Sequence, residues 1–232
     1  MTQDDPAWDT AVRDDGPIDA ESGQPARVGR KRDHSRDALI LDAALEVLAE
    51  AGYEGMTVDM VAVRAKAGKA TVYRRWPSKA ELILAAVARM KRSQVDLDRL
   101  PDTGTLRGDL VAMIKPQSIE EGERKLKIMA GLASMLSHDL GLAEAASAAV
   151  IEPWAAAHRV LMQRAVDRGE ILASADIETV SHVIPSLAAS RALTQRKPVD
   201  RDFLVSLIDG LLMPALRPAP VAAVPAPTGR SP

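Results

Sequence analysis

The sequence predicts an all-α protein. Apolar residues recur at helical spacing through most of residues 30–216, and no alternating run of β-branched residues is as long as a strand. Capping residues and glycines stand at the ends of these periodic segments. The 232 residues, 47% of them apolar, suffice for one large domain or two smaller ones with buried cores. Residues 1–29 and 217–232 are rich in Asp, Gly or Pro without apolar periodicity, and we expect disordered tails there.

Composition excludes several classes of protein. The chain has no cysteine, which rules out disulfide frameworks, thiolate nucleophiles and Cys-ligated metal sites. His138, His158 and His182 stand at no spacing that favours a metal, so we expect neither metal nor cofactor. No apolar stretch approaches the roughly 18 residues of a membrane span, and the acidic N-terminus is unlike a signal peptide. We therefore expect a cytoplasmic protein without a membrane contact.

Charge is distributed unevenly along the chain. Residues 1–29 carry a net charge of −5, residues 30–92 carry +5, and residues 93–232 carry −2. Within residues 64–79 there are six cations and no acid. Such a run is either a solvated helix face or, because it has a single sign, a surface that binds a polyanion such as nucleic acid.

The segment 30–92 has the pattern of a helix-turn-helix DNA-binding domain. A helix is predicted over 36–51 with Gly52 as its left-handed end, and Thr57 caps a short helix that reaches about residue 65. A glycine-containing turn at 66–68 precedes a second short helix at 69–75, which Pro77 ends. A capping box from Ser78 to Glu81 opens a fourth helix to about residue 92.

Residues 36–90 resemble the N-terminal domain of the tetracycline-repressor (TetR) family of bacterial transcription regulators. The resemblance is carried by TVDMVA at 57–62 and AGKATVYRRWPSKAEL at 67–82. It implies a homodimer that binds a palindromic double-stranded DNA operator and releases it when a small-molecule effector enters the C-terminal domain. Beyond residue 90 the chain resembles the family only in being helical and of suitable length, so the effector is not implied.

Side chains of the second short helix suit the major groove. Lys69, at its start, can donate to guanine O6 and N7, while Ala70 and the methyl group of Thr71 can approach a thymine methyl. The side chains suited to phosphate are Tyr73, Arg74, Arg75 and Lys79. The resemblance implies phosphate contacts at Thr57, Tyr73 and Lys79, and most variation at Lys69 and Ala70.

Some of these residues have alternative interpretations. Tyr73 can be a core aromatic instead, although Val72 and Trp76 are better placed to fill the core. Arg30, Lys31 and Arg32 form either an arm that contacts DNA or a solvated hinge. The sequence from Gly68 faintly resembles a phosphate-binding loop, but it lacks the first glycine and the Ser or Thr after lysine that such a loop requires.

Residues 93–216 are predicted to form a helical bundle for ligand binding and dimerisation. Helices are expected at about 105–115, 118–137, 140–150, 153–169, 176–195 and 200–216. The last of these has an apolar face wider than burial in one chain requires. We therefore predict that the last two helices of each subunit form a four-helix dimer interface through Ile184, Leu187, Phe203, Leu204, Leu207 and Leu211.

An effector cavity in this bundle would be lined by flexible apolar side chains on its central helices. The candidates are Met129, Met135, Trp154, His158 and Met162. Methionines at helical spacing are also ordinary core residues, and that alternative stays open.

The function predicted from the sequence is that of a ligand-responsive repressor. A ligand-independent DNA-binding protein or activator is the first alternative, and an α-helical enzyme is the second. The sequence has no HExxH motif, no phosphate loop and no nucleophile with a neighbouring base, so we expect no catalysis.

Overall fold

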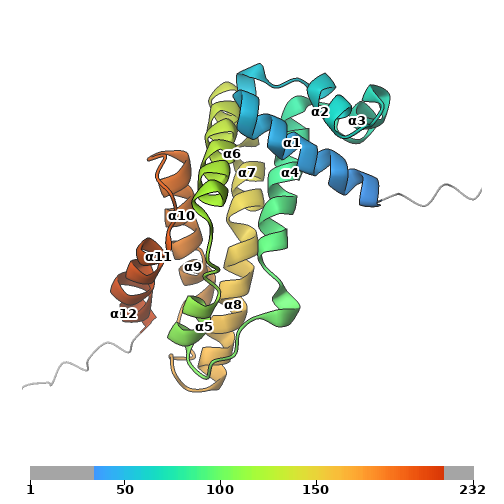
Figure 1. The fold of residues 1–232 in the computed structure, drawn as a ribbon. Coiled ribbons are helices and arrows are strands. Elements are labelled where there is room, and N and C mark those ends of the chain that lie inside the picture. Colours follow the sequence, from blue (N-terminus) through green and yellow to red (C-terminus); the bar gives the residue numbers. More distant parts are fainter. Residues whose placement is uncertain (1–33, 217–232) are drawn as a thin grey trace, which may run out of the picture. The chain divides into compact units, whose positions relative to one another are not determined.

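The computed structural model describes residues 34–216 (Figure 1). The predicted tails and the basic segment 30–32 lie outside the described residues. The described part of the chain consists of helices and their connections and contains no strand, so the predicted all-α class is confirmed. No helix in this part of the chain combines the length and the apolar character needed to cross a bilayer.

The N-terminal helices form where the capping signals placed them. They are α1 (His34–Gly55), α2 (Val58–Arg64), α3 (Lys69–Arg75) and α4 (Lys79–Gln94). Helix α1 bends at Gly52, whose φ of 69° is accessible to glycine at little cost. The side chains of Thr57 and Ser78 accept hydrogen bonds from the first-turn amides of α2 and α4, respectively.

The predicted turn at 66–68 connects α2 and α3. Its positive φ of 50° falls on Lys66, whereas Gly68 is extended and stands at the N-cap of α3. The carbonyl of Lys66 accepts a hydrogen bond from Arg36 at 3.2 Å, which ties the turn to α1. A tertiary contact therefore supports a left-handed backbone conformation at a residue that is not glycine.

Eleven helical segments follow α4 and complete the described chain. They are η1 (Leu97–Arg99), α5 (Leu106–Ala112), α6 (Ile119–His138), η2 (Leu140–Leu142), α7 (Ala143–Val150), α8 (Glu152–Asp167), α9 (Ile177–Ser181), α10 (Val183–Leu193), α11 (Arg201–Leu207), the π-helical η3 (Ile208–Leu212) and α12 (Met213–Leu216). A capping box starts α6: the Ser118 side chain accepts from the Glu121 amide, and the Glu121 side chain accepts from the Ser118 amide.

Three predicted C-terminal helices are shorter or interrupted. The expected helix 176–195 is divided at His182 into α9 and α10, because Pro185 has no amide hydrogen and its ring would collide with the carbonyl of Ser181 in a continuous helix. The expected helix 200–216 changes to π-helical bonding in η3 before Pro214. The helix expected at 105–115 ends at Ala112.

Buried apolar residues form two clusters. The first joins α1–α4 to α6, α7 and α10, with Ile40, Val61 and Val72 at its centre and wholly buried. The second lies between α5, α8, α10 and η3. The apolar interior is thus continuous across the predicted boundary at residue 92, and the helix-turn-helix shares its core with α6.

Helices α1 and α6 approach closely because α6 has a glycine at their crossing. A Cβ atom built on Gly131 would lie 2.5 Å from Cδ1 of Leu48, a side chain that is 1% exposed. Any larger residue must displace Leu48 or separate the helices. The contact therefore couples the helix-turn-helix to the C-terminal helices sterically.

Gly131→Ala should lower the free energy of unfolding by about 1–2 kcal/mol, because overpacking a well-packed core outweighs the better helix propensity of alanine. Gly122→Ala is the matched control on the same helix, since a Cβ there meets no atom within 4 Å. The control should raise stability by about 0.5–1 kcal/mol. Urea denaturation of both variants measures the two effects, and equal stabilisation by both would contradict the close approach.

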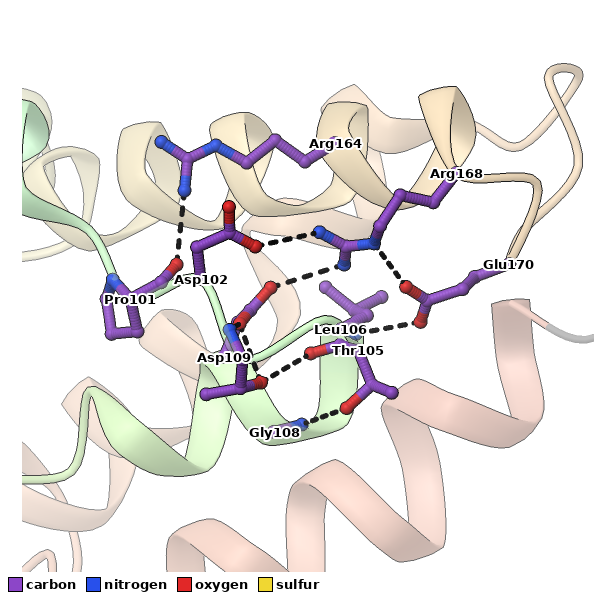
Figure 2. Close-up of polar contacts among 10 residues, drawn as sticks. Pro101, Asp102, Thr105, Leu106, Gly108, Asp109, Arg164, Arg168 and Glu170 are labelled. Atoms are coloured by element: carbon purple, nitrogen blue, oxygen red, sulfur yellow. Dashed lines mark hydrogen bonds and ion pairs between the residues drawn. The ribbon is translucent and has the colours of Figure 1, made fainter.

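The connection between α4 and α5 is held against the end of α8 by a polar network (Figure 2). Arg164 donates to the Pro101 carbonyl at 3.1 Å, and Arg168 contacts both Asp102 and Asp109. Glu170 accepts from Arg168 and from the amide of Leu106, in the first turn of α5. These contacts fix the chain that leads out of the helix-turn-helix.

Candidate nucleic-acid interface

Helix α3 presents its N-terminal side chains to solvent. Val72 is wholly buried and anchors the helix, whereas Lys69 and Ala70 are exposed and Thr71 is half-buried. Tyr73 is 41% exposed, so the alternative that places it in the core is wrong. The three residues predicted to read bases thus lie together on the accessible side of α3.

The ammonium group of Lys69 is paired across the turn. It lies 2.9 Å from the carboxylate of Asp59 on α2 and 5.9 Å from the centroid of the Tyr73 ring. The hydrogen bond with Asp59 raises the pKa of Lys69 above its ordinary value, and the charge of the carboxylate adds to this effect. Lys69, a candidate for base recognition, is therefore already paired with the Asp59 carboxylate in the absence of DNA.

The cations predicted to bind phosphate differ in availability. Arg74 is exposed on α3. Arg75 forms an ion pair with Asp37 in the first turn of α1, and both side chains are largely buried. A phosphate contact by Arg75 would have to replace this pair, so of the two arginines Arg74 has the clearer access.

Lys79 is the first residue of α4, and its side chain binds the carbonyl groups at the end of α1. Its Nζ donates to the carbonyls of Tyr53 and Met56 at 2.7 and 3.3 Å and lies 4.1 Å from the Tyr53 ring centroid. The Tyr53 ring stacks on His138 at the end of α6, and His138 in turn pairs with Glu54 at 2.7 Å. The predicted phosphate contact of Lys79 would use the remaining hydrogen of an ammonium group that the fold already orients.

Thr57 is an N-cap, as predicted: its Oγ1 accepts from the Met60 amide at 3.2 Å. Thr57→Ala should lower the free energy of unfolding by about 1 kcal/mol, because one first-turn amide loses its partner. Ser190→Ala, an exposed interior position of α10, is the control and should be close to neutral. Chemical denaturation of both variants measures the two free energies of unfolding. Equal losses would mean that Thr57 stabilises the protein no more than an ordinary exposed hydroxyl group does.

The sequence reasoning missed the acids that organise this surface. Asp37 and Asp59 contact cations 38 and 10 residues away, and Arg64 pairs with Glu50 on α1 at 2.6 Å. Only the pairing of Asp59 with Lys69 had a signal in the sequence, because the two residues stand on opposite sides of the predicted turn.

The predicted effector residues are divided between the two apolar clusters. Met129 and Met135 pack in the first cluster, whereas Met162 and the half-buried Trp154 belong to the second. His158, on the same face of α8, is 5% exposed. The structure does not bring the five residues together. Two open grooves of about 540 and 350 Å³ lie between α1 and α6, and none of the five lines either groove.

The predicted dimer residues are on the surface or at its edge, with one exception. Leu187 and Leu211 are 38% and 43% exposed, and the structure leaves three others half-buried: Phe203, Leu204 and Leu207. Ile184 is buried in the second apolar cluster of its own chain, so little of its side chain is left for a partner. The apolar face on α10, α11 and η3 is thus largely accessible.

Known proteins match the chain in both halves. Residues 40–86 match the family model described as bacterial regulatory proteins, tetR family, and residues 100–211 match the tetracyclin repressor-like C-terminal domain. The HTH-type transcriptional regulator Rv1556 of Mycobacterium tuberculosis is 36% identical over 78% of this chain and 88% of its own length. A DNA-binding transcriptional repressor TetR of Mycobacteroides abscessus is 34% identical over 81% of this chain and 97% of its own.

Solved structures show the same fold. The TetR family transcription regulator SCO0332 superposes with a TM-score of 0.58 at 24% identity, over 79% of this chain and all of its own. Salmonella enterica GusR has a TM-score of 0.55 at 18% identity, over 79% of this chain and 98% of its own. The solved structures share the fold, and the two sequence relatives with the two family models show that the chain belongs to the TetR family of helix-turn-helix transcriptional regulators.

Proposed function

We propose that this protein is a homodimeric repressor that binds a palindromic operator and releases it when a small-molecule effector binds. The exposed N-terminal half of α3, with Lys69, Ala70 and Thr71 accessible beside Tyr73 and Arg74, is the observation that carries the proposal. The name of the Mycobacteroides abscessus relative supports repression rather than activation. Since the operator is chromosomal DNA, we place the protein in the cytoplasm, and we propose no catalytic activity.

Base and phosphate contacts have separate roles in this proposal. Lys69, Ala70 and Thr71 read base edges, whereas Thr57, Tyr73, Arg74 and Lys79 bind phosphate and fix the register of α3 in the groove. Arg75 joins them only if it leaves Asp37. Loss of a reader should change sequence preference, and loss of a phosphate contact should weaken binding to every sequence alike.

Two subunits are needed because α3 has only seven residues and reads few base pairs. A dimer presents two copies of α3 about 34–36 Å apart, or at a multiple of that distance, to successive major grooves. The face formed by α10, α11 and η3, with Leu187 and Leu211 exposed, supplies a surface for such a dimer. An apolar face shared by two copies is self-complementary about a two-fold axis.

Release of the operator would follow from the apolar core that the helix-turn-helix shares with α6. A ligand that binds between the C-terminal helices and shifts α6 also shifts α1, because Leu48 and Gly131 leave no space between them. The two copies of α3 would then no longer fit successive grooves. A coupling free energy of about 1–3 kcal/mol corresponds to about 5- to 150-fold weaker operator binding.

Selection of DNA from a random pool by the purified full chain tests the proposal. We expect palindromic sites whose half-site spacing is one helical turn or a multiple, a dimer by light scattering, and affinity that falls steeply with salt. A monomer that binds no DNA in any salt would overturn the proposal. A chemically broad panel of small molecules then tests release, and failure of every compound would favour the ligand-independent alternative.

Charged substitutions on the apolar face test the dimer surface. Leu187→Glu combined with Leu211→Glu should shift the chain toward monomer and weaken binding to the palindrome more than binding to one half-site. Leu172→Glu is the matched control, because Leu172 is 49% exposed but lies outside α10, α11 and η3. This variant should leave the dimer intact. A dimer retained in the double variant would place the interface elsewhere.

A further inference from the structure

Asp59 and Lys69 form a donor–acceptor pair at the surface proposed to enter the major groove. The ammonium group lies 2.9 Å from each carboxylate oxygen, and each side chain is 58% exposed. An exposed ion pair of this kind contributes little to folding. The pair is therefore free to serve recognition, and it joins α2 to the first residue of α3.

The spacing of the pair matches the edge of one base pair. In the major groove a G·C pair presents N7 and O6 of guanine as acceptors, followed by the N4 amino group of cytosine as a donor. The cytosine N4 atom donates to guanine O6 at about 2.9 Å, an ordinary length for such a bond. An ammonium donor and a carboxylate acceptor that are 2.9 Å apart can contact both bases without separating.

No other base pair presents all three of these groups in this order. An A·T pair places the adenine amino group where Lys69 needs an acceptor and thymine O4 where Asp59 needs a donor. A T·A pair keeps an acceptor and then a donor in thymine O4 and adenine N6, but it replaces guanine N7 with the thymine methyl group, so the second contact of Lys69 distinguishes it from G·C. A C·G pair reverses the order. Lysine alone tolerates more of these arrangements than lysine with a carboxylate beside it.

We infer that Asp59 is a specificity-determining residue that reads cytosine N4 while Lys69 reads the paired guanine, so that one G·C pair in each half-site is recognised by the two side chains as a unit. The inference rests on the proposed function, because it requires α3 to lie in the major groove. It concerns a residue on α2, outside the helix that carries the other proposed readers.

A competing role for Asp59 has a different consequence. If the carboxylate only neutralises Lys69, its removal adds positive charge to the surface and should strengthen binding to every DNA sequence alike. If the carboxylate reads cytosine, its removal must change the preference at a single position of the half-site. Base preference therefore separates the two roles, whereas overall affinity alone does not.

The experiment is DNA selection with the full-length wild type, Asp59→Ala, Lys69→Ala and the double variant. We expect the wild type to select G·C at one position, and each single variant to lose about 5- to 150-fold of that preference at the same position. The double variant should lose no more than either single variant, because the pair acts as a unit. Asp59→Glu, which keeps an acceptor, should retain part of the preference.

Glu50→Ala is the matched control, since Glu50 is an exposed acid paired with Arg64 and its loss changes the net charge equally. Its base preferences should equal those of the wild type, and thermal unfolding should show all variants folded. Asp59→Ala with tighter binding and unchanged preferences would overturn the inference while leaving the proposed function intact. A wild type that selects no site would overturn the proposed function and this inference together.

Discussion

Arg168→Ala should lower the free energy of unfolding by about 3 kcal/mol, because it leaves a buried carboxylate without its charged partner. Asp109 is wholly buried on α5, and Arg168 donates to it at 3.2 Å from the end of α8 (Figure 2). The amide and hydroxyl of Thr103 remain as donors at 2.5 and 2.8 Å, which keeps the loss at the lower end for a broken buried pair. Urea denaturation measures the change.

Two further variants distinguish this network from an ordinary surface ion pair. Arg107→Ala removes an exposed arginine that forms two hydrogen bonds with Asp209, and we expect little change in stability. Arg168→Lys keeps the charge but cannot reach Asp102, Asp109 and Glu170 together, so its stability should be intermediate. Equal effects of Arg168→Ala and Arg107→Ala would contradict the buried network.

The network also has a consequence for DNA binding. Residues 95–105 connect α4 to α5, and Arg164 and Arg168 attach this segment to α8. When the attachment is lost, the position of α4 relative to the C-terminal helices is less restricted. We therefore expect Arg168→Ala to weaken operator binding even at temperatures where the variant remains folded.

The N-terminal helices were predictable because their signals are local. A hydroxyl three residues before an unpaired amide specifies an N-cap, and Thr57, Ser78 and Ser118 all cap helices where the sequence indicated. The side chains that α3 exposes followed from the same spacing, since Val72 alone must face the core. Local chemistry thus positions most of the candidate site.

The remaining features depend on contacts between distant residues. Nothing near Arg75 in the sequence indicates that Asp37 will pair with it, and nothing near Arg168 indicates Asp109. The interruption at His182 had a local signal in Pro185, but the helix 176–195 was predicted from its apolar stripe alone. Periodicity identifies which face of a helix is apolar, whereas breaks in a helix depend on individual backbone hydrogen bonds.

His158 should make the protein less stable as the pH falls from about 6.5 toward 4. Burial lowers its pKa from 6.5 to about 4, a hydrogen bond with the Ser181 backbone opposes the shift weakly, and Nδ1 has no hydrogen-bond partner. Between these two values the unfolded chain binds a proton that the folded chain does not, so stability rises with pH. The difference of about 2.5 pH units corresponds to about 3 kcal/mol, to order of magnitude.

Comparison of pH profiles isolates the contribution of this ring. His158→Gln removes the titrating group, and its free energy of unfolding should depend on pH less steeply than that of the wild type between pH 4 and 6.5, whatever its absolute stability. Met162→Leu, one helical turn further along α8 and also buried, perturbs the packing without removing a titrating group and should keep the wild-type slope. Identical slopes in wild type and His158→Gln would mean that the ring binds a proton equally well in the folded and unfolded chains, which would contradict the lowered pKa.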